Sequence, residues 1–295
     1  MNPIQYPAKV LLFGEYSVIA GSEALALPIQ QFGGSWDFSA TANDSHHQLS
    51  LFLNYLRASV YNFSHFLNLD ALQEELSRGI YLKSNIPYGY GLGSSGSVCA
   101  AVFDRFKLST QPALPSNSLR ALFSQMESFF HCNSSGLDPL VSYLNKPVII
   151  LPDQQISILD NCSGFHNGLD VYLFDSGRPR ITEPLVLAFK EKLKDPEFEQ
   201  SLSSELKPLI HTVIDRWVKE GDVFNLISEI SKWQLKNMSY LIPESVLLVW
   251  KTLTKELNIV FKLCGAGGGG YFLVFAEKGS FVPETIKKGL IKISP

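Results

Sequence analysis

The residues best suited to chemistry form a glycine-rich loop that runs into a helix. The segment Ile86–Phe106 reads IPYGYGLGSSGSVCAAVFDRF and contains Gly89, Gly91, Gly93 and Gly96. Glycines let backbone N–H groups approach a ligand closely, and the first turn of a helix offers unpaired N–H groups with a partial positive charge. Because apolar residues recur at helical spacing after the loop, we expect a helix that begins at about residues 94–97 and binds an anion such as phosphate.

Three other interpretations of this loop compete with a phosphate site. Gly91–Gly96 matches the dinucleotide pattern G-x-G-x-x-G, but the stretch Leu108–Asn117, where an acidic strand end is needed, contains no Asp or Glu. The Walker pattern is excluded because no Lys-Ser or Lys-Thr closes the loop. A Gly/Ser-rich connection in which a serine caps the helix stays open on this loop alone.

A second glycine-rich loop lies near the C-terminus. Lys262–Gly270 reads KLCGAGGGG, with five glycines in six residues, between two apolar runs typical of strands. So many glycines weaken regular structure, which favours a loop whose backbone approaches a ligand. The alternative is a bulge or tight hairpin, for which one or two glycines suffice. The two loops could converge on one site, which the sequence alone does not decide.

Two acids, Glu127 and Asp138, are candidate functional residues. Glu127 lies at the edge of an apolar helical face, where a carboxylate pays a desolvation cost unless it is paired or bound to a metal; a half-exposed glutamate at the rim is the alternative. Asp138 follows NSSGL and precedes Pro139, and its alternative role is a helix N-cap.

Charged residues also flank the first apolar strand. Lys9 stands beside it and Glu15 just after its Gly14, and lone charges in such places are most often solvated. His131 has no second histidine at ligand spacing, which argues against zinc. His46–His47 is expected in an exposed polar loop. No G-x-S-x-G pattern supports a serine hydrolase.

The elements that must position these residues mix strands and helices without strict β-α-β alternation, so the sequence favours an α+β fold. Asp70 is a candidate cap for the second helix. The polar stretch Asp160–Gly168 is the expected domain boundary. Strands are expected at Val10–Phe13, Ala24–Ile29, Trp36–Thr41, Gly79–Lys83, Val148–Leu151, Ile156–Leu159, Val171–Phe174, Val260–Leu263 and Tyr271–Phe275. Helices are expected at Leu51–Phe66, Asp70–Ser77, around 119–130, Glu183–Lys194, Ser203–Lys219, Asp222–Lys236, Glu244–Leu257 and near Pro283–Gly289.

Composition narrows the class of protein. The 295 residues suggest two domains, and 45% apolar with 18% charged residues is ordinary for a globular chain. The net charge of −3, with no basic run longer than Lys287–Lys288, gives no footprint for nucleic acid. Four scattered cysteines (Cys99, Cys132, Cys162 and Cys264) favour a reducing compartment. With no signal peptide pattern and no long apolar run, the sequence predicts a cytoplasmic protein with small-molecule partners and no membrane contact.

Taken together, these segments resemble the GHMP kinase superfamily. Tyr6–Ile29 resembles the first of the three family motifs, PYGYGLGSSGS at Pro87–Ser97 fits the second, and Lys262–Gly270 is similar to the third. Met126–Leu144 and Asp175–Thr182 resemble segments of the mevalonate kinases, and the spacing from Glu127 to Asp138 is kept.

The resemblance implies a fold, two domains and a reaction. The expected fold is α+β, with an N-terminal ATP-binding domain (1–162) of the ribosomal protein S5 domain 2-like type and a ferredoxin-like C-terminal domain (163–295), and with ATP and substrate between them. The activity implied is transfer of a phosphoryl group from ATP to mevalonate, with Mg²⁺ as the metal. A homodimer is one arrangement that the sequence leaves open.

The resemblance also implies roles for single residues. Asp138 would be the general base and Lys9 would sit beside it, contacting the phosphoryl group or the substrate, while Ser95 and Glu127 would hold Mg²⁺. ATP would contact Gly89, Gly91, Leu92, Gly93, Ser94, Ser95, Gly96, Ser97, Gly265, Ala266, Gly267 and Gly268. The substrate would contact Lys9, Glu15, Tyr16, Asp138 and Thr182.

The chain departs from the mevalonate kinase pattern at several positions. Tyr16 replaces the usual histidine, and Gly96-Ser97 replaces Ala-Ala; both variants resemble bacterial phosphomevalonate kinases. That substrate is a dianion, for which Arg178 and Arg180 are candidate partners. A phosphomevalonate kinase, a related decarboxylase and a catalytically silent ligand-binding homologue therefore remain alternatives.

Overall fold

The computed structural model describes residues 6–41, 43–109, 114–131, 133–160, 168–256, 259–280, 282–283, 287 and 289–293. The chain divides into two compact units. Unit 1 comprises residues 1–9, 28–86 and 93–146, and unit 2 comprises residues 10–27, 87–92 and 147–295. The predicted boundary at Asp160–Gly168 falls almost entirely outside the described residues, so the division into domains at residue 162 stays a prediction.

Two strands contribute residues to both units. Strand β1 (Tyr6–Phe13) and strand β2 (Ala24–Phe38) each continue from one unit into the other. The first sheet has the order β1-β2-β4-β5, and β3 also pairs with β2. Almost every residue of β1 is buried, which explains why its sequence is continuously apolar except at Lys9.

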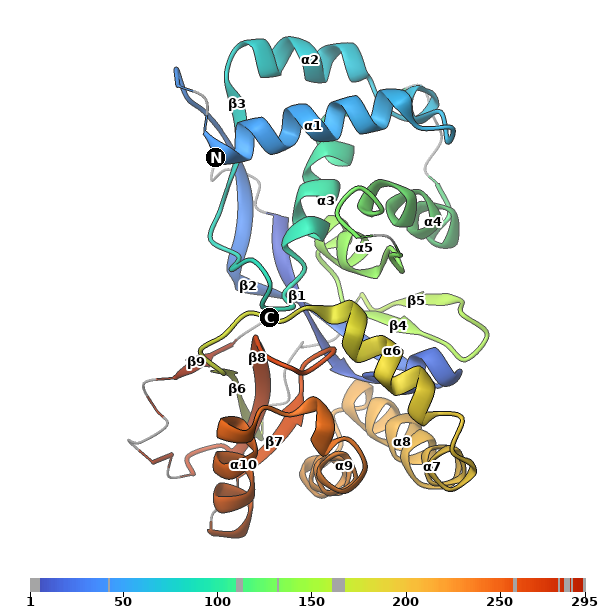
Figure 1. Ribbon diagram of the computed structural model, residues 1–295, viewed down its shortest axis with the longest axis vertical. Coiled ribbons are helices and arrows are strands. Elements are labelled where there is room, and N and C mark those ends of the chain that lie inside the picture. Colours follow the sequence, from blue (N-terminus) through green and yellow to red (C-terminus); the bar gives the residue numbers. More distant parts are fainter. Residues whose placement is uncertain are drawn as a thin grey trace. The chain divides into compact units, whose positions relative to one another are not determined.

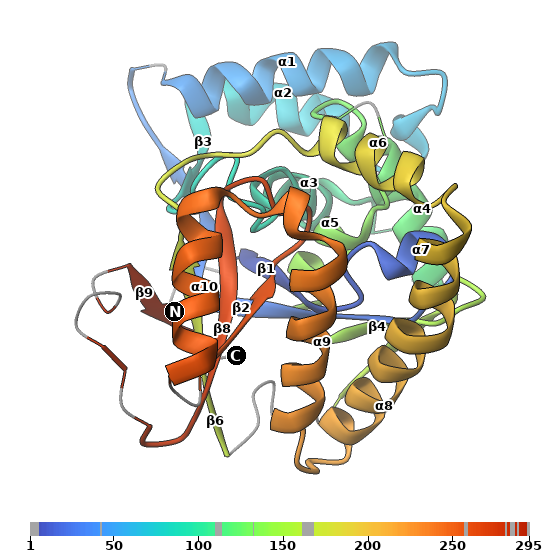
Figure 2. The ribbon, with the colours of Figure 1, turned by 60° about the horizontal axis from the view of Figure 1, so that its bottom comes forward.

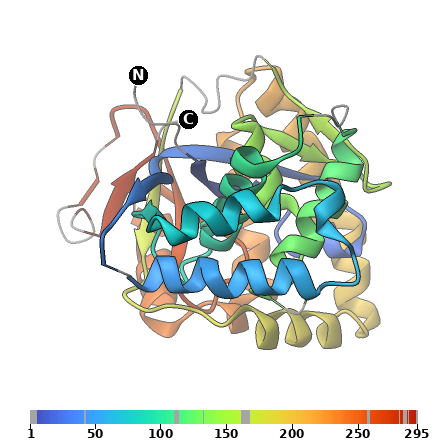
Figure 3. The ribbon, with the colours of Figure 1, turned by 90° about the horizontal axis from the view of Figure 1, so that it is seen from above.

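In unit 1, the second half of β2 pairs antiparallel with β3 (Ile80–Ser84), from Gly34 opposite Ser84 to Phe38 opposite Ile80. Helices α1 (Asp44–Ala58) and α2 (Leu69–Ser77) pack against each other, as Figures 1 and 3 show from two directions. Helix α3 (Ser94–Phe106) packs against α4 (Ser116–Glu127) and α5 (Leu137–Leu144). Apart from Lys9 and Gly93, which is the N-cap of α3, the predicted site residues of this unit lie on these three helices.

In unit 2, β4 (Val148–Ile150) pairs with the start of β2 and with β5 (Ile156–Ile158). The second sheet is antiparallel, in the order β7-β8-β6-β9. Its strands are β6 (Leu169–Asp175), β7 (Ile259–Leu263), β8 (Tyr271–Glu277) and β9 (Leu290–Lys292). The mixture of helices with antiparallel sheets confirms the predicted α+β class.

Helices cover part of the second sheet. Helices α9 (Phe224–Asn237) and α10 (Glu244–Glu256) pack against β7 (Figure 1). Helix α8 (Lys207–Val218) packs against α9, which Figure 2 shows. Helices α6 (Thr182–Lys192) and α7 (Pro196–Ser201) precede them. Four short helical turns complete the described elements: Ser17–Ala20, Phe63–His65, Leu202–Leu206 and Ser239–Leu241.

Several predicted boundaries were wrong. The helix expected at Leu51–Phe66 begins earlier, because the Asn43 side chain accepts from the His46 N–H and caps α1 at Asp44, and it ends at Ala58. His46 and His47 therefore lie on a helix, and His46 Nε2 is 3.0 Å from Leu76 O. Asn68, not Asp70, caps α2.

Other differences concern longer stretches. The expected helix Ser203–Lys219 starts further back, as α7 continues through a π-helical turn into α8. Trp36–Thr41 is no separate strand, since β2 runs without a break to Phe38. The short helix expected near Pro283–Gly289 lies largely outside the described residues. Among the residues described, no helix combines the length and apolar composition needed to cross a membrane.

Candidate active site

In unit 1, the predicted base and its lysine are in contact. Lys9 Nζ lies 2.8 Å from Asp138 Oδ1, and the two side chains are 10% and 28% exposed. Lys9 comes from β1, and Asp138 lies in the first turn of α5, where the partial positive charge of the helix N-terminus favours a carboxylate. The N-cap of α5 is Gly136, so Asp138 is not the helix cap that its sequence context allowed. The carboxylate keeps partial access to solvent.

Asp138 also lies against the start of α3. A Cβ atom placed on Gly96 would come within 2.7 Å of the Asp138 carbonyl carbon, and one on Gly93 within 3.1 Å of Asp138 Oδ2. Gly93 is the N-cap of α3, at φ 74°, a conformation that favours glycine. The backbone at the N-terminus of α3 can therefore approach the acid closely. An anion bound by the first N–H groups of α3 would lie near this carboxylate and its lysine.

The proposed metal ligands are also neighbours. Ser95 Oγ donates to Glu127 Oε1 at 2.8 Å, and the Ser134 hydroxyl donates to the other carboxylate oxygen. Ser95 lies in the first turn of α3 and Glu127 is the last residue of α4. His131 Nε2 lies 3.2 Å from Ser95 Oγ. The spacing of the histidines in the sequence argues only against zinc at His131, and no sequence pattern indicates a role for Ser134.

Glu127 is almost fully buried, with 4% of its surface exposed, so the rim position considered from the sequence is wrong. Burial, and then the negative charge of Asp138, raise its pKa from 4.5 to about 7, although hydrogen bonds from Ser134 and Ser95 and the charge of Lys9 oppose the shift. A cation next to this carboxylate would favour its ionised form.

The pair of Ser95 and Glu127 fits Mg²⁺. This ion takes oxygen ligands, binds through one or two carboxylates, and completes its octahedron with water and phosphate. One buried carboxylate beside a hydroxyl, at the N-terminus of a helix suited to phosphate, meets these requirements. A cluster of three or more His, Cys, Asp or Glu side chains, as a protein-only metal cage needs, is absent from the described part of the chain.

Not every serine of the loop is available to a ligand. Ser97 is fully buried and its hydroxyl donates to Tyr6 O at 3.0 Å, which ties α3 to β1. Ser94 is half-buried, whereas the Leu92 side chain is fully buried and belongs to the core. We therefore expect Ser97 to support the loop and Ser94 to be the more accessible hydroxyl.

In unit 2, both glycine-rich loops contact one arginine. A Cβ on Gly91 would lie 2.0 Å from Arg180 Nη2, and one on Gly265 would lie 2.6 Å from the same atom. Arg180 Nη1 donates to Cys264 O at 2.6 Å, and the Arg180 N–H donates to Gly89 O at 2.9 Å. Both glycines have positive φ, 81° for Gly91 and 77° for Gly265, which favours glycine, and a side chain at either position would also displace the guanidinium.

Arg180 was considered from the sequence only as a partner for a second phosphate. The structure puts its cation beside the backbone of both loops, a setting suited to an anionic ligand. Thr182, predicted to contact the substrate, begins α6 and is exposed.

In the second glycine-rich loop, two backbone N–H groups are already used within the fold: the Gly268 N–H donates to Leu241 O at 2.6 Å and the Gly270 N–H donates to Arg178 O at 2.7 Å.

Glu15 and Tyr16 are buried in unit 2. The Glu15 carboxylate forms an ion pair with Lys262, and no part of either side chain is exposed. Tyr16 is 5% exposed, and its hydroxyl donates to Ala266 O at 2.6 Å. Burial raises the pKa of this hydroxyl above its ordinary value, against the opposing charge of Arg180, so it remains a donor. The sequence-based expectation that a charge at Glu15 is solvated was wrong.

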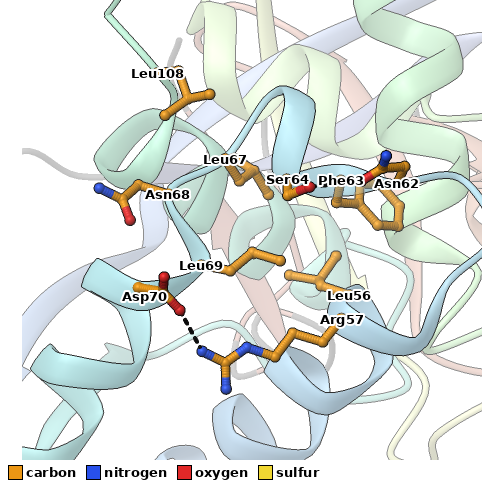
Figure 4. A pocket seen from close by; sticks show the side chains of 10 residues that line it. All are labelled: Leu56, Arg57, Asn62, Phe63, Ser64, Leu67, Asn68, Leu69, Asp70 and Leu108. Carbon is orange, nitrogen blue, oxygen red and sulfur yellow. Dashed lines mark hydrogen bonds and ion pairs between the residues drawn. The ribbon is translucent and has the colours of Figure 1, made fainter.

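Unit 1 also contains a pocket of about 470 Å³ that is not lined by the predicted site residues. It lies between the end of α1 and the start of α2 and contains Phe63, Leu67 and Asn68 in its wall. Figure 4 shows Arg57 of this pocket paired with Asp70, at 2.8 Å. None of its lining residues is a predicted site residue, so we do not assign the chemistry to it.

Comparison with known proteins agrees with this geometry. Residues 54–146, which include the N-terminus of α3, Glu127 and Asp138, match the family model "GHMP kinases N terminal domain". The structure of L. major mevalonate kinase in complex with R-mevalonate superposes with a TM-score of 0.66 at 15% identity, covering 99% of this chain and 95% of that one. The chain has the GHMP kinase fold. With the matched N-terminal domain, it is an ATP-dependent small-molecule kinase, as the sequence predicted.

Two other relatives bear on the substrate of this kinase. Mevalonate kinase from Pyrococcus horikoshii is 27% identical in an alignment that covers 92% of this chain and 87% of the relative. Streptococcus pneumoniae phosphomevalonate kinase, in complex with phosphomevalonate and AMPPNP, superposes with a TM-score of 0.63 at 19% identity, covering 95% and 93% of the two chains. The fold is thus shared by relatives with both substrates.

The buried carboxylate of Glu127 gives a prediction about stability. Between pH 4.5 and about 7 the folded protein holds a proton that the unfolded chain has lost, so the free energy of unfolding falls as the pH rises through this window. Glu127→Gln removes the titrating group, and with it this decrease in the free energy of unfolding. We expect the variant, without Mg²⁺, to be more stable than the wild type by up to about 3 kcal/mol at pH 8 and nearly equal to it at pH 4.5.

Urea unfolding at the two pH values measures this difference. Glu75→Gln is the control, because Glu75 is a partly exposed helical glutamate paired with Arg105 on the surface of the same unit. An equal gain for Glu127→Gln at pH 4.5 and pH 8 would show that burial does not raise the pKa of Glu127.

Proposed function

We propose that this kinase transfers the γ-phosphoryl group of ATP to the C5 hydroxyl of mevalonate, giving 5-phosphomevalonate. The observation that carries the proposal is the contact of Asp138 with Lys9, beside the N-terminus of α3. The names of the relatives at 22–27% identity, all mevalonate kinases, support the choice of alcohol.

Asp138 would accept the proton of the attacking hydroxyl group while the hydroxyl oxygen of the substrate forms a bond to the γ-phosphorus. The bond from that phosphorus to the β–γ bridging oxygen breaks, and ADP leaves with the electron pair. A base in this position contributes roughly 10²–10⁴-fold to the rate. The ammonium group of Lys9, 2.8 Å from the carboxylate, would hold Asp138 in place and attract the negative phosphoryl group.

The other residues would bind the nucleotide. N–H groups in the first turn of α3 would contact phosphate oxygens, and Ser95 with Glu127 would hold Mg²⁺. The bound ion would neutralise charge on the phosphate oxygens, which is the main demand of phosphoryl transfer together with positioning. The backbone of the second glycine-rich loop, beside Arg180, would supply further contacts to an anion.

Phosphomevalonate kinase activity is the second candidate. Arg180 lies against both glycine-rich loops, and its cation would suit a substrate that carries a dianion. The variant Gly14-Glu15-Tyr16 in the first motif, which resembles phosphomevalonate kinases, points the same way.

Parallel assays of ADP release separate the candidates. With ATP, Mg²⁺ and either mevalonate or phosphomevalonate, we expect a higher kcat/KM for mevalonate. A preference for phosphomevalonate would replace the first proposal by the second. Release of CO₂ from diphosphomevalonate would indicate a decarboxylase, and ATP binding without turnover of any alcohol would indicate a silent homologue.

A further inference from the structure

The buried ion pair in unit 2 connects segments that are far apart in the sequence. Glu15 follows β1, and Lys262 lies in β7, 247 residues later, immediately before the second glycine-rich loop. Lys262 Nζ also donates to Leu263 O at 3.0 Å. With both side chains fully enclosed, neither charge can reach a substrate. The pair therefore holds the backbone after β1 against the base of the loop.

Tyr16 makes a second connection to the same loop. Its backbone has φ 62° and ψ −43°, and the Ser17 N–H donates to Glu15 O at 2.7 Å. This is the γ-turn with positive φ, which is rare and strained, and such strain persists only where the surroundings hold it. Here the Tyr16 ring packs on Phe189, with 4.7 Å between ring centroids, and its hydroxyl reaches Ala266 O.

The bond to Ala266 determines the direction of the next amide. A trans peptide unit is planar, so its carbonyl and its N–H point in opposite directions. When Tyr16 fixes the Ala266 carbonyl, the Gly267 N–H must point away from Tyr16. Within the described part of the chain, the Gly267 N–H has no hydrogen-bond acceptor. It is an oriented, unused donor in a loop that contacts Arg180.

We infer that Glu15, Tyr16 and Lys262 are positioning residues, which orient the second glycine-rich loop so that the Gly267 N–H can donate to a phosphate oxygen of the nucleotide. The inference rests on the proposed function and deepens it, since it assigns Tyr16 to nucleotide binding through Ala266. Tyr16 then makes no contact with the alcohol substrate. The role differs from the substrate contacts that the resemblance implied for Glu15 and Tyr16.

Tyr16→Phe tests this inference, because it removes only the hydroxyl and keeps the ring against Phe189. Loss of one hydrogen bond, at a net value of about 1 kcal/mol, corresponds to about a five-fold change in an equilibrium. We expect the Kd of AMPPNP with Mg²⁺ to rise about five-fold by calorimetry and the KM for the alcohol to stay unchanged. Amide hydrogen exchange in residues 264–270 should become faster.

Tyr172→Phe is the matched control. Tyr172 is a half-buried tyrosine on β6 of the same unit, and its hydroxyl has only a 3.5 Å contact with Asp170. This variant should leave both constants and the exchange rates unchanged.

Two results would overturn the inference while leaving the proposed function intact. One is an unchanged Kd for AMPPNP in Tyr16→Phe with unchanged exchange in the loop. The other is a rise confined to the KM of the alcohol, which would make Tyr16 a substrate contact. If the wild-type protein itself binds no AMPPNP, the proposed function fails and the inference fails with it.

Discussion

Replacement of Asp138 by asparagine is expected to lower kcat at least about a hundredfold, which is the low end for loss of a positioned base. Asparagine keeps the size of the side chain but cannot accept the proton of the attacking hydroxyl. Nucleotide binding should persist, because the N–H groups at the start of α3 are untouched. Steady-state turnover together with the Kd of AMPPNP measures both effects.

Asp104→Asn is a close control for this variant. Asp104 forms an ion pair with Lys107 at 2.8 Å, and its side chain is 26% exposed. Asp138 likewise forms an ion pair with Lys9 at 2.8 Å, and its side chain is 28% exposed. The two substitutions therefore remove similar charges from similar surroundings in unit 1. Near-normal turnover in Asp138→Asn would remove Asp138 from the role of base, and an equal loss in Asp104→Asn would show that the effect is general.

Replacement of Lys262 by methionine is expected to lower the free energy of unfolding by about 3–5 kcal/mol, because it removes the cation that is paired with the fully buried Glu15 carboxylate. Burial by itself lowers the pKa of Lys262, and the charge of Glu15 is the largest influence that opposes this shift. Each partner therefore stabilises the charged form of the other. Glu15→Gln should destabilise the fold for the same reason. Urea unfolding at pH 7 measures both losses.

The double variant Glu15→Leu with Lys262→Met distinguishes the loss of this ion pair from the loss of packing. Replacement of a buried pair by apolar side chains of similar size is often neutral, so most of the stability should return. Lys107→Met, which breaks a pair that is 44% exposed on the lysine side, should cost at most about 1 kcal/mol. If the double variant is as unstable as the sum of the single ones, the pair is not the cause.

The parts of the fold that could be predicted are those whose cause is local. The helix after the first glycine-rich loop was expected to begin at about residues 94–97, and α3 begins at Ser94, because an apolar stripe and a glycine run mark that point directly. Strand β6 (Leu169–Asp175) was expected at Val171–Phe174, within two residues of both ends, because a short apolar run marks it in the sequence. Where a cap decides the boundary, as Asn43 does for α1, the apolar pattern alone misplaced it.

The features that could not be predicted depend on contacts between distant segments. Glu15 has a buried partner 247 residues away, and nothing near it in the sequence indicates that partner. Arg180 lies against Gly91 and Gly265, yet it belongs to neither loop. The burial of Glu127 similarly depends on how α4 packs against α3 and α5. The spacing of apolar residues can indicate which face of a helix is buried, but not which other elements cover a residue at the edge of that face.

³¹P NMR of wild-type protein incubated with ATP, Mg²⁺ and mevalonate follows the donor and the product of the proposed reaction together. We expect the γ-phosphate signal of ATP to be lost while ADP and one new phosphomonoester, identical to 5-phosphomevalonate, increase in equal amounts. ATP signals that stay constant, or that decay only to ADP and inorganic phosphate, would contradict the claim that this protein phosphorylates mevalonate.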